Sequence, residues 1–402
     1  MNAMPQLRRL SPRCLMMVAG AVVLAACGTQ TPVKEIPPAA TPALGETEIR
    51  ELDITYFAER AHRDPTGASD LARLGALYLS RSRETGDPRD VLLAEEVARR
   101  SLRNRPQRNG QAVQVLQSSL LAQHRFDEAL TLALAARDAE PENAALRAAV
   151  GEIQMELGQY DSARVSFAGV KAALGDPAVA PRLARWAEIE GNPDKARRLL
   201  HAALETVKRL PEVPREQLAW YWLRIGDVEL RGGQFAAADS AYRSGLAAHV
   251  DDYRLLSAVA HSALLQKRYQ RAITFGEKAL SVTLDPSTLG ILSDAYAAIG
   301  DSAKSEEYAH VLDVVVLKQP GAYHRAWSLF LLDHDRHLAT VSKKIREEMR
   351  TRKDIYAYDL LAWSLHKQGR DREAADAMTV ALSRGTKDPQ LQYHAREIMG
   401  QQ

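Results

Sequence analysis

The chain of 402 residues has only two cysteines, Cys14 and Cys27, and both lie within the first thirty residues. The rest of the chain can therefore form no disulfide and no cysteine-ligated metal site. Aromatic residues make up only 6% of the sequence, and the formal net charge is only +2. Nucleic-acid binding usually draws on an excess of positive charge, with stacking aromatics where single strands are bound. The composition therefore argues against a nucleic-acid partner.

The common enzyme motifs are also missing from the sequence. It contains no GxxxxGK[ST] phosphate loop, no HExxH zinc motif, no GxSxG nucleophile motif and no GxGxxG dinucleotide loop. Each of these motifs places backbone amides or side chains where its chemistry requires them. We therefore expect a protein that is not an enzyme, with no catalytic residue, no metal and no cofactor.

Residues 1–26 have the pattern of a signal peptide. Three arginines and no acidic residue precede the apolar run Leu15–Ala26, which is shorter than the roughly 20 residues that span a bilayer. The run ends in LAACG, which resembles the bacterial lipobox, where a lipoprotein signal peptidase cuts before a diacylglycerol-modified cysteine. The resemblance implies that Cys27 is the site of lipid attachment. The alternative is an ordinary secretory signal whose cleavage site adjoins a cysteine.

The residues that follow Cys27 predict a location and a tether. Gly28 stands where aspartate would retain a Gram-negative lipoprotein in the inner membrane, so the resemblance implies an outer-membrane lipoprotein that faces the periplasm. Four prolines between residues 27 and 48 favour extended structure. At ~3 Å per residue, such a tether could hold a folded body, residues 49–400, as far as ~60 Å from the lipid surface.

Beyond residue 48 the chain repeats one motif at a stride near 34 residues. The five clearest copies superpose on a central alanine: FDEAL (126–130), YDSAR (160–164), PDKAR (193–197), FAAAD (235–239) and YQRAI (269–273). Apolar residues recur at intervals of three and four throughout, and no alternating strand pattern of useful length is present. The sequence therefore predicts an all-α fold built from one repeated unit.

At this stride the sequence resembles the tetratricopeptide repeat family. One unit carries the family pattern in Trp222, Gly226, Phe235, Ala238 and Tyr242. The resemblance covers roughly residues 50–400 and implies a solenoid of about nine helical hairpins wound into a right-handed superhelix. Small residues allow the two helices of a hairpin to approach closely, and glycine suits the turn between them. A longer loop near residues 205–217 is a possible joint.

The resemblance also implies a binding surface, because in this family the first helices of the hairpins line a concave groove. The repeat register places eight residues there: Glu152, Arg185, Trp220, Asp227, Arg231, Arg254, His261 and Asp294. Tryptophan and arginine dominate interface hot spots, so Trp220 and Arg231 are the expected anchors. The alternative role for Trp220 is packing against the 205–217 loop. The expected partner is a protein or peptide segment of the cell envelope.

One polar cluster, Asp333-His334-Asp335-Arg336-His337, allows a different function. Two histidines three residues apart could share a helical face and bind a divalent metal together with a carboxylate. The competing interpretation is a polar turn between helices. The sequence thus predicts a lipid-anchored adaptor that assists envelope assembly or localisation. Its alternatives are a metal-binding protein or enzyme that uses this cluster, and a scaffold that acts by self-association.

Overall fold

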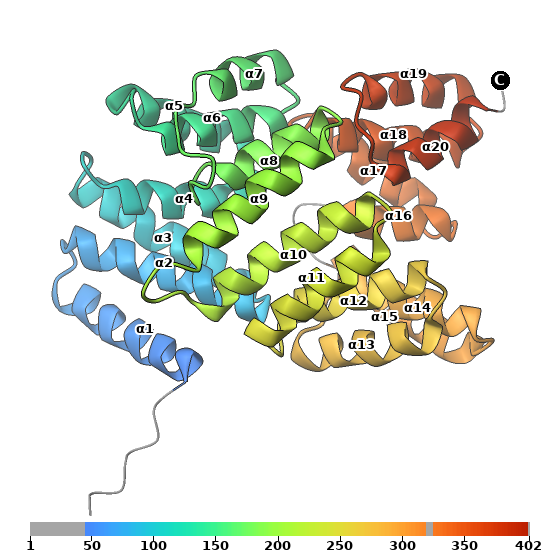
Figure 1. The fold of residues 1–402 in the computed structure, drawn as a ribbon, viewed down its shortest axis with the longest axis horizontal. Helices are drawn as coiled ribbons and strands as arrows, with labels where there is room; N and C mark the ends of the chain where they lie inside the picture. Colours follow the sequence, from blue (N-terminus) through green and yellow to red (C-terminus); the bar gives the residue numbers. More distant parts are fainter. Residues whose placement is uncertain (1–44, 319–324, 401–402) are drawn as a thin grey trace, which may run out of the picture. The chain divides into compact units, whose positions relative to one another are not determined.

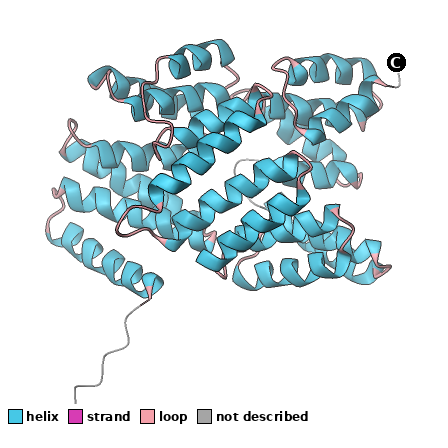
Figure 2. Ribbon diagram, viewed as in Figure 1, coloured by secondary structure: helices cyan, strands magenta, loops and turns pink. Residues whose placement is uncertain are grey.

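The computed structural model describes residues 45–318 and 325–400, and within these ranges the chain forms α-helices and no strand (Figure 2). The helices are α1 (Glu46–Arg63), α2 (Ala68–Thr85), α3 (Pro88–Asn104), α4 (Gly110–Ala122), α5 (Phe126–Ala139), α6 (Ala144–Glu156), α7 (Tyr160–Ala168), α8 (Ala180–Ile189), α9 (Pro193–Val207), α10 (Arg215–Arg231), α11 (Phe235–Ala248), α12 (Tyr253–Leu265), α13 (Tyr269–Val282), α14 (Pro286–Ala298), α15 (Ser302–Lys318), α16 (Arg325–Asp333), α17 (Leu338–Glu348), α18 (Ile355–His366), α19 (Asp371–Leu382) and α20 (Pro389–Met399). The predicted all-α class is confirmed.

The described helices form nine hairpins, from α2–α3 to α18–α19, with α1 before them and α20 after them (Figure 1). Within each hairpin the two helices pack against each other. The first helices of neighbouring hairpins also contact one another, as α6 contacts α8 and α10 contacts α12. Contacts that run mainly between neighbours are the defining property of a solenoid. The prediction of about nine helical hairpins is therefore confirmed.

The repeated alanines lie where the two helices of a hairpin cross. All five alanines used to align the motifs have no exposed surface: Ala129, Ala163, Ala196, Ala238 and Ala272. The facing position of the first helix is often glycine. A Cβ at Gly226 of α10 would lie 2.2 Å from the Tyr242 ring of α11. The small residues are thus required because an aromatic ring or a backbone occupies the space where a larger side chain would extend.

The turn inside each described hairpin contains at least one residue with positive φ. In six of these nine turns it is glycine, including Gly158 and Gly233 with φ of +74° and +72°. Glycine adopts this left-handed conformation without a steric penalty, and it commonly terminates helices. The prediction that glycine suits the turn between the two helices is therefore confirmed in these hairpins. His124, Lys267 and Asp335 take the same position in other hairpins.

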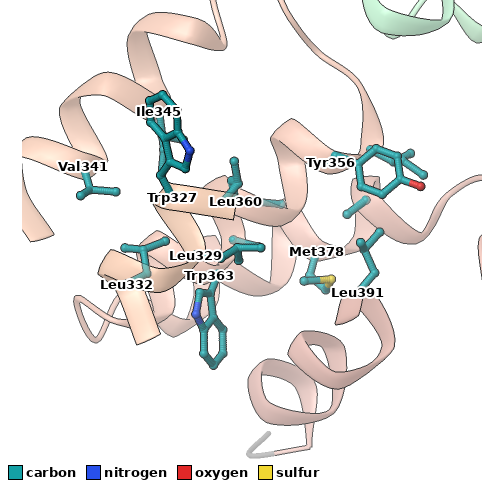
Figure 3. Packing of buried hydrophobic residues seen from close by; sticks show 14 of the residues in the cluster. Trp327, Leu329, Leu332, Val341, Ile345, Tyr356, Leu360, Trp363, Met378 and Leu391 are labelled. Carbon is teal, nitrogen blue, oxygen red and sulfur yellow. The ribbon is translucent and has the colours of Figure 1, made fainter. Parts of the chain in front are cut away.

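The C-terminal hairpins pack back against hairpins from the first half of the chain. The largest buried cluster includes Trp327, Leu360 and Trp363 from α16 and α18 (Figure 3) together with Phe167 and Trp186 from α7 and α8. The late hairpins therefore share one apolar core with the α6–α8 region.

We call the backbone contact between these two regions the seam, and define it by Gly158, Tyr160, Lys353 and Ile355. The Ile355 amide donates a hydrogen bond of 2.7 Å to the hydroxyl of Tyr160. The Cα of Gly158 lies so close to the Lys353 carbonyl that an added Cβ would be 2.1 Å from its oxygen. The seam joins segments almost 200 residues apart in the sequence.

The structure can be compared with the predicted domain limits only from residue 45 onward. The signal peptide, Cys27 and most of the predicted tether lie outside the described residues. Helix α1 begins at Glu46, so the last three residues of the predicted tether are helical; Glu46 and Glu48 favour a helix N-terminus by their charge. No helix in the described part of the chain is both long and apolar enough to cross a membrane.

Candidate binding cavity

A cavity of about 1500 Å³ is lined mainly by the first helices of the hairpins. Its walls come from α2, α6, α8, α10 and α12 in the earlier part of the chain, and from α16, α18 and the start of α20 in the C-terminal part. Because hairpins far apart in the chain contribute to it, the cavity depends on the packing of the C-terminal hairpins against the α6–α8 region.

The structure brings six of the eight predicted groove residues together in this lining. They are Glu152, Arg185, Trp220, Asp227, Arg231 and His261. Each of the six lies two, six or thirteen residues before the positive-φ residue of its hairpin turn. A single repeat register therefore accounts for all of them. Whether they bind a partner stays a prediction.

The other two predicted residues, Arg254 and Asp294, do not line the cavity. Arg254 turns toward Asp252, with which it forms a salt bridge of 2.6 Å, and toward Glu216 at 3.4 Å. Asp294 is paired with the imidazole of His334 at 2.8 Å. Both side chains are drawn by partners of opposite charge into contacts within the solenoid wall.

Trp220 lies at the cavity and also packs into the solenoid wall, and its binding role stays a prediction. Its half-buried side chain lines the cavity. Trp220 and Val213 of the 205–217 loop both pack against the same apolar cluster, and the Trp220 ring meets Tyr221 edge to face, with centroids 5.0 Å apart. Packing on one side therefore fixes the orientation of a ring whose other side faces the cavity, as an interface anchor requires.

Sequence reasoning missed several lining residues, among them five arginines and Tyr356: Arg83, Arg182, Arg224, Arg325, Arg352 and Tyr356. Tyr356 could have been found by counting. It lies thirteen residues before Gly369, as Trp220 lies thirteen before Gly233, and both glycines occupy the hairpin turn. The repeat register thus places an aromatic side chain at the same level of α10 and α18.

Most of the charged side chains of the cavity wall form arginine–carboxylate pairs. Arg182 lies 2.7 Å from Glu152, and Arg83 lies 3.0 Å from Glu216. Arg231 pairs with the buried Glu188, whose carboxylate also lies 3.4 Å from Arg224. These pairs hold long side chains in fixed positions, so the wall is ordered before any partner arrives.

The pKa values of two buried glutamates differ in direction. Burial favours the neutral form of Glu188, but the charges of Arg231 and Arg224 outweigh it and hold the pKa of Glu188 below its ordinary value. Burial, together with the charge of Asp354, raises the pKa of Glu156 above its ordinary value, although Arg352 opposes this. Glu188 is therefore a firm anion in the wall, whereas burial favours the neutral form of Glu156.

Arg185 differs from the other arginines of the wall. Its guanidinium carbon lies 4.5 Å from the centroid of the Tyr356 ring, and its Nη1 donates a hydrogen bond of 3.1 Å to the Tyr356 hydroxyl. Arg325 lies over the same ring at 4.9 Å, and its Nη2 is 2.8 Å from Asp359. Two positive charges thus meet at one aromatic ring.

The Asp333–His337 cluster is a hairpin turn and forms no metal site. Asp335 has a φ of +53° at the turn between α16 and α17. The side chains point to separate partners, because His334 pairs with Asp294 and His337 lies 3.3 Å from Asp313. Within residues 45–318 and 325–400 no group of three or more His, Cys, Asp or Glu residues could hold a metal ion. The alternative metal function therefore has no support in the geometry.

Three family models, each described as tetratricopeptide repeat, match residues 120–185, 176–249 and 223–287. No curated protein matches the chain. Among solved structures, human IFIT1 bound to m7Gppp-AAAA is 14% identical, with 79% of this chain and 72% of that chain covered at a TM-score of 0.50. PilW, a type IV pilus biogenesis factor, is 16% identical over 63% of this chain and 94% of that chain, at a TM-score of 0.37.

At these identities the structural likeness concerns the fold alone. The family models, the nine hairpins and the buried alanines at a stride near 34 residues all agree with one architecture. Such scaffolds are typically non-enzymatic and act by holding protein partners. The chain is a tetratricopeptide repeat protein, a helical scaffold for protein–protein interaction.

Proposed function

We propose that the protein is a lipid-anchored adaptor of the cell envelope that binds a segment of a partner protein in its cavity and so assists envelope assembly or localisation. The observation that carries the proposal is the cavity itself, in which a fixed aromatic anchor, Trp220, and a wall of arginine–carboxylate pairs surround about 1500 Å³. This volume exceeds the roughly 300–1000 Å³ of pockets that hold drug-sized ligands, and it suits several residues of a polypeptide.

The anchor rests on the sequence of the first thirty residues. Two or three acyl chains on one cysteine attach a protein stably, whereas a single chain gives only marginal binding. Cys27 precedes α1 by fewer than twenty residues. An extended tether of that length, at ~3 Å per residue, would keep the cavity within tens of ångströms of the membrane surface.

The anchor is tested by acyl labelling in a bacterial host. Changing Cys27→Ser should abolish incorporation of labelled fatty acid and release the protein from the membrane fraction. The matched control is Cys14→Ser, which lies before the predicted cleavage site and should leave labelling intact. Labelling that persists in the Cys27→Ser protein would place the anchor elsewhere.

The cavity is tested by photo-crosslinking in the native envelope, followed by mass spectrometry. A benzophenone amino acid replaces Gln217, which lines the cavity, or Arg243, which is exposed on α11. We expect a partner captured at position 217 but not at 243. A second copy of the chain as the captured species would instead indicate a self-associating scaffold.

The chain also offers a matched pair of tryptophans for this test. Trp220 and Trp222 are both half-buried and both pack against the same apolar cluster, but only Trp220 lines the cavity. Trp220→Ala should remove the crosslink at position 217, and Trp222→Ala should keep it. Equal loss in both variants would mean that packing, not binding, was disturbed, and would contradict the proposal.

A further inference from the structure

The arginines that line the cavity are paired with carboxylates, with one exception. Six of these arginines, as described, lie within 4.0 Å of a carboxylate: Arg83 with Glu216, Arg182 with Glu152, Arg224 with Asp227, Arg231 with Glu188, Arg325 with Asp359 and Arg352 with Asp354. Arg185 has no carboxylate within this distance in the part of the chain that the structure describes. Its charge is therefore not committed to an ion pair within the wall.

Arg185 nevertheless has a fixed position. The Tyr356 ring packs against its guanidinium, and the Tyr356 hydroxyl accepts one of its hydrogen bonds. A guanidinium has five N–H donors, so one acceptor leaves most of them unused. Arg325, beside the same ring, has a buried Nε without a hydrogen-bond partner among the described residues. Donor capacity is thus left over at both guanidinium groups.

The nearby acids form no ion pair with Arg185 among the described residues. Glu156, which lines the cavity, pairs with Arg352 at 3.2 Å, and burial favours its neutral form. Asp359 is fully buried and is shared between Arg325 and His394, which lies 2.7 Å away. Burial disfavours the charge of Arg185, but Tyr356 and the more distant carboxylates of Glu156, Glu188 and Asp354 outweigh it and raise the pKa of Arg185. Arg185 is therefore a firm cation whose N–H donors stay available to a carboxylate supplied from outside.

We propose that Arg185, stacked on Tyr356 and supported by Arg325, binds the side-chain carboxylate of an aspartate or glutamate in an acidic segment of the partner protein. This inference rests on the proposed function and specifies the chemistry of the partner. A guanidinium presents a planar fork that matches a carboxylate with two parallel hydrogen bonds. The ring of Tyr356 fixes the plane of that fork, so the carboxylate meets a prepared partner.

The composition of the lining favours a polypeptide with few acids over a polyanion. Seven arginines line the cavity, but so do five carboxylates: Glu152, Glu156, Glu216, Asp227 and Asp388. A nucleic acid carries a charge at every residue, and an excess of two arginines over carboxylates in the lining neutralises few of its phosphates, whereas a peptide can place one or two carboxylates at Arg185 alone. Trp220 in the same lining suits an apolar residue beside those carboxylates.

The test is a selection of random twelve-residue peptides on the full chain purified in detergent. Selected peptides are then measured by fluorescence anisotropy with four proteins: the unchanged chain, Arg185→Met, Trp220→Ala and the control Arg243→Met, which alters an arginine outside the cavity. Circular dichroism checks that all four are folded.

We expect Asp or Glu to be enriched at one or two positions of the selected peptides. A charge-assisted hydrogen-bonded pair predicts that Arg185→Met weakens their binding by about 10- to 100-fold, while Arg243→Met leaves it unchanged. Replacing the acid of the peptide by its amide should cause the same loss, and the loss should not add to that of Arg185→Met.

The contrary outcomes are distinct. Peptides that depend on Trp220 but show no acidic enrichment, or bind Arg185→Met equally well, would overturn this inference and leave the proposed function intact. If no selected peptide depends on Trp220, both fail. A twelve-nucleotide oligouridylate is measured in the same way. If it binds the unchanged chain more tightly than any peptide does and its binding is lost in Arg185→Met, the site binds nucleic acid and the inference is overturned.

Discussion

The approach of Gly158 to Lys353 allows a sharp test of the seam. Gly158 has a φ of +74°, and a Cβ added there would lie 2.1 Å from the carbonyl oxygen of Lys353. Gly233 occupies the same hairpin position with a φ of +72°, but a Cβ there would meet nothing within 4 Å. Gly233→Ala therefore measures the cost of the left-handed conformation alone, and Gly158→Ala adds a collision with a distant part of the chain.

The two costs can be separated in magnitude. The left-handed conformation costs a non-glycine residue about 1 kcal/mol. The collision adds about 1–3 kcal/mol, typical of overpacking, because the atom met is a backbone oxygen that cannot rotate away. We therefore expect Gly233→Ala to lose about 1 kcal/mol of unfolding free energy. Gly158→Ala should lose about 2–4 kcal/mol.

Hydrogen exchange at the Ile355 amide is the most direct assay. This amide donates to the Tyr160 hydroxyl across the seam, so it should exchange faster when the backbones are forced apart. A loss of 1–3 kcal/mol at the seam corresponds to roughly 5- to 150-fold faster exchange. Global unfolding is a weaker readout, because repeat arrays often unfold in more than one step. Unchanged exchange at Ile355 in Gly158→Ala, with equal stability losses in both variants, would refute the seam.

Three further predictions concern packing and charge. Gly226→Ala should lower the unfolding free energy by about 1–2 kcal/mol in urea titration, since its Cβ would meet the buried Tyr242 ring at 2.2 Å, and Tyr242→Leu should relieve the loss. Glu188→Gln should cost about 3 kcal/mol because it removes the carboxylate partner of Arg231 and one of the two carboxylate partners of Arg224, whereas Arg185→Met should cost under about 1 kcal/mol; equal losses would mean that Arg185 is paired. Burial raises the pKa of Tyr221 from 10.0 to about 12, so the unfolded chain ionises first and stability falls as pH rises from 10 through 12; Tyr221→Phe, which cannot ionise, should show a smaller loss over this range in thermal unfolding.

The hairpins could be predicted because the repeat specifies its own local contacts. A buried alanine such as Ala238 and a turn glycine such as Gly233 are dictated within one hairpin, so their spacing in the sequence reports the structure directly. Six of the eight proposed groove residues line the cavity for the same reason. Asp294 does not, because its imidazole partner, His334, comes from the next hairpin and could not be inferred from a single unit.

The return of the late hairpins to the α6–α8 region could not be predicted from the repeat. A repeat unit encodes contacts with its neighbours, whereas this return depends on small rotations that accumulate over several hairpins. Arg185 and Tyr356 are 171 residues apart in the sequence and are in contact in the structure. Their pairing is therefore a property of the whole array, although each residue lies at a position that the register already marks as facing the cavity.

The return of the late hairpins also explains why a binding site would lie between α8 and α18. A groove within neighbouring hairpins changes shape whenever the array bends, since each interface contributes its own rotation. A site between α8 and α18 is held on both walls, because the seam fixes the distance between them through the backbone contact at Gly158 and the hydrogen bond to the Tyr160 hydroxyl. Such a site loses less freedom when a partner binds, so more of its contact energy appears as affinity. The unpaired charge of Arg185 lies at the point where the two walls meet, where rigidity benefits recognition most.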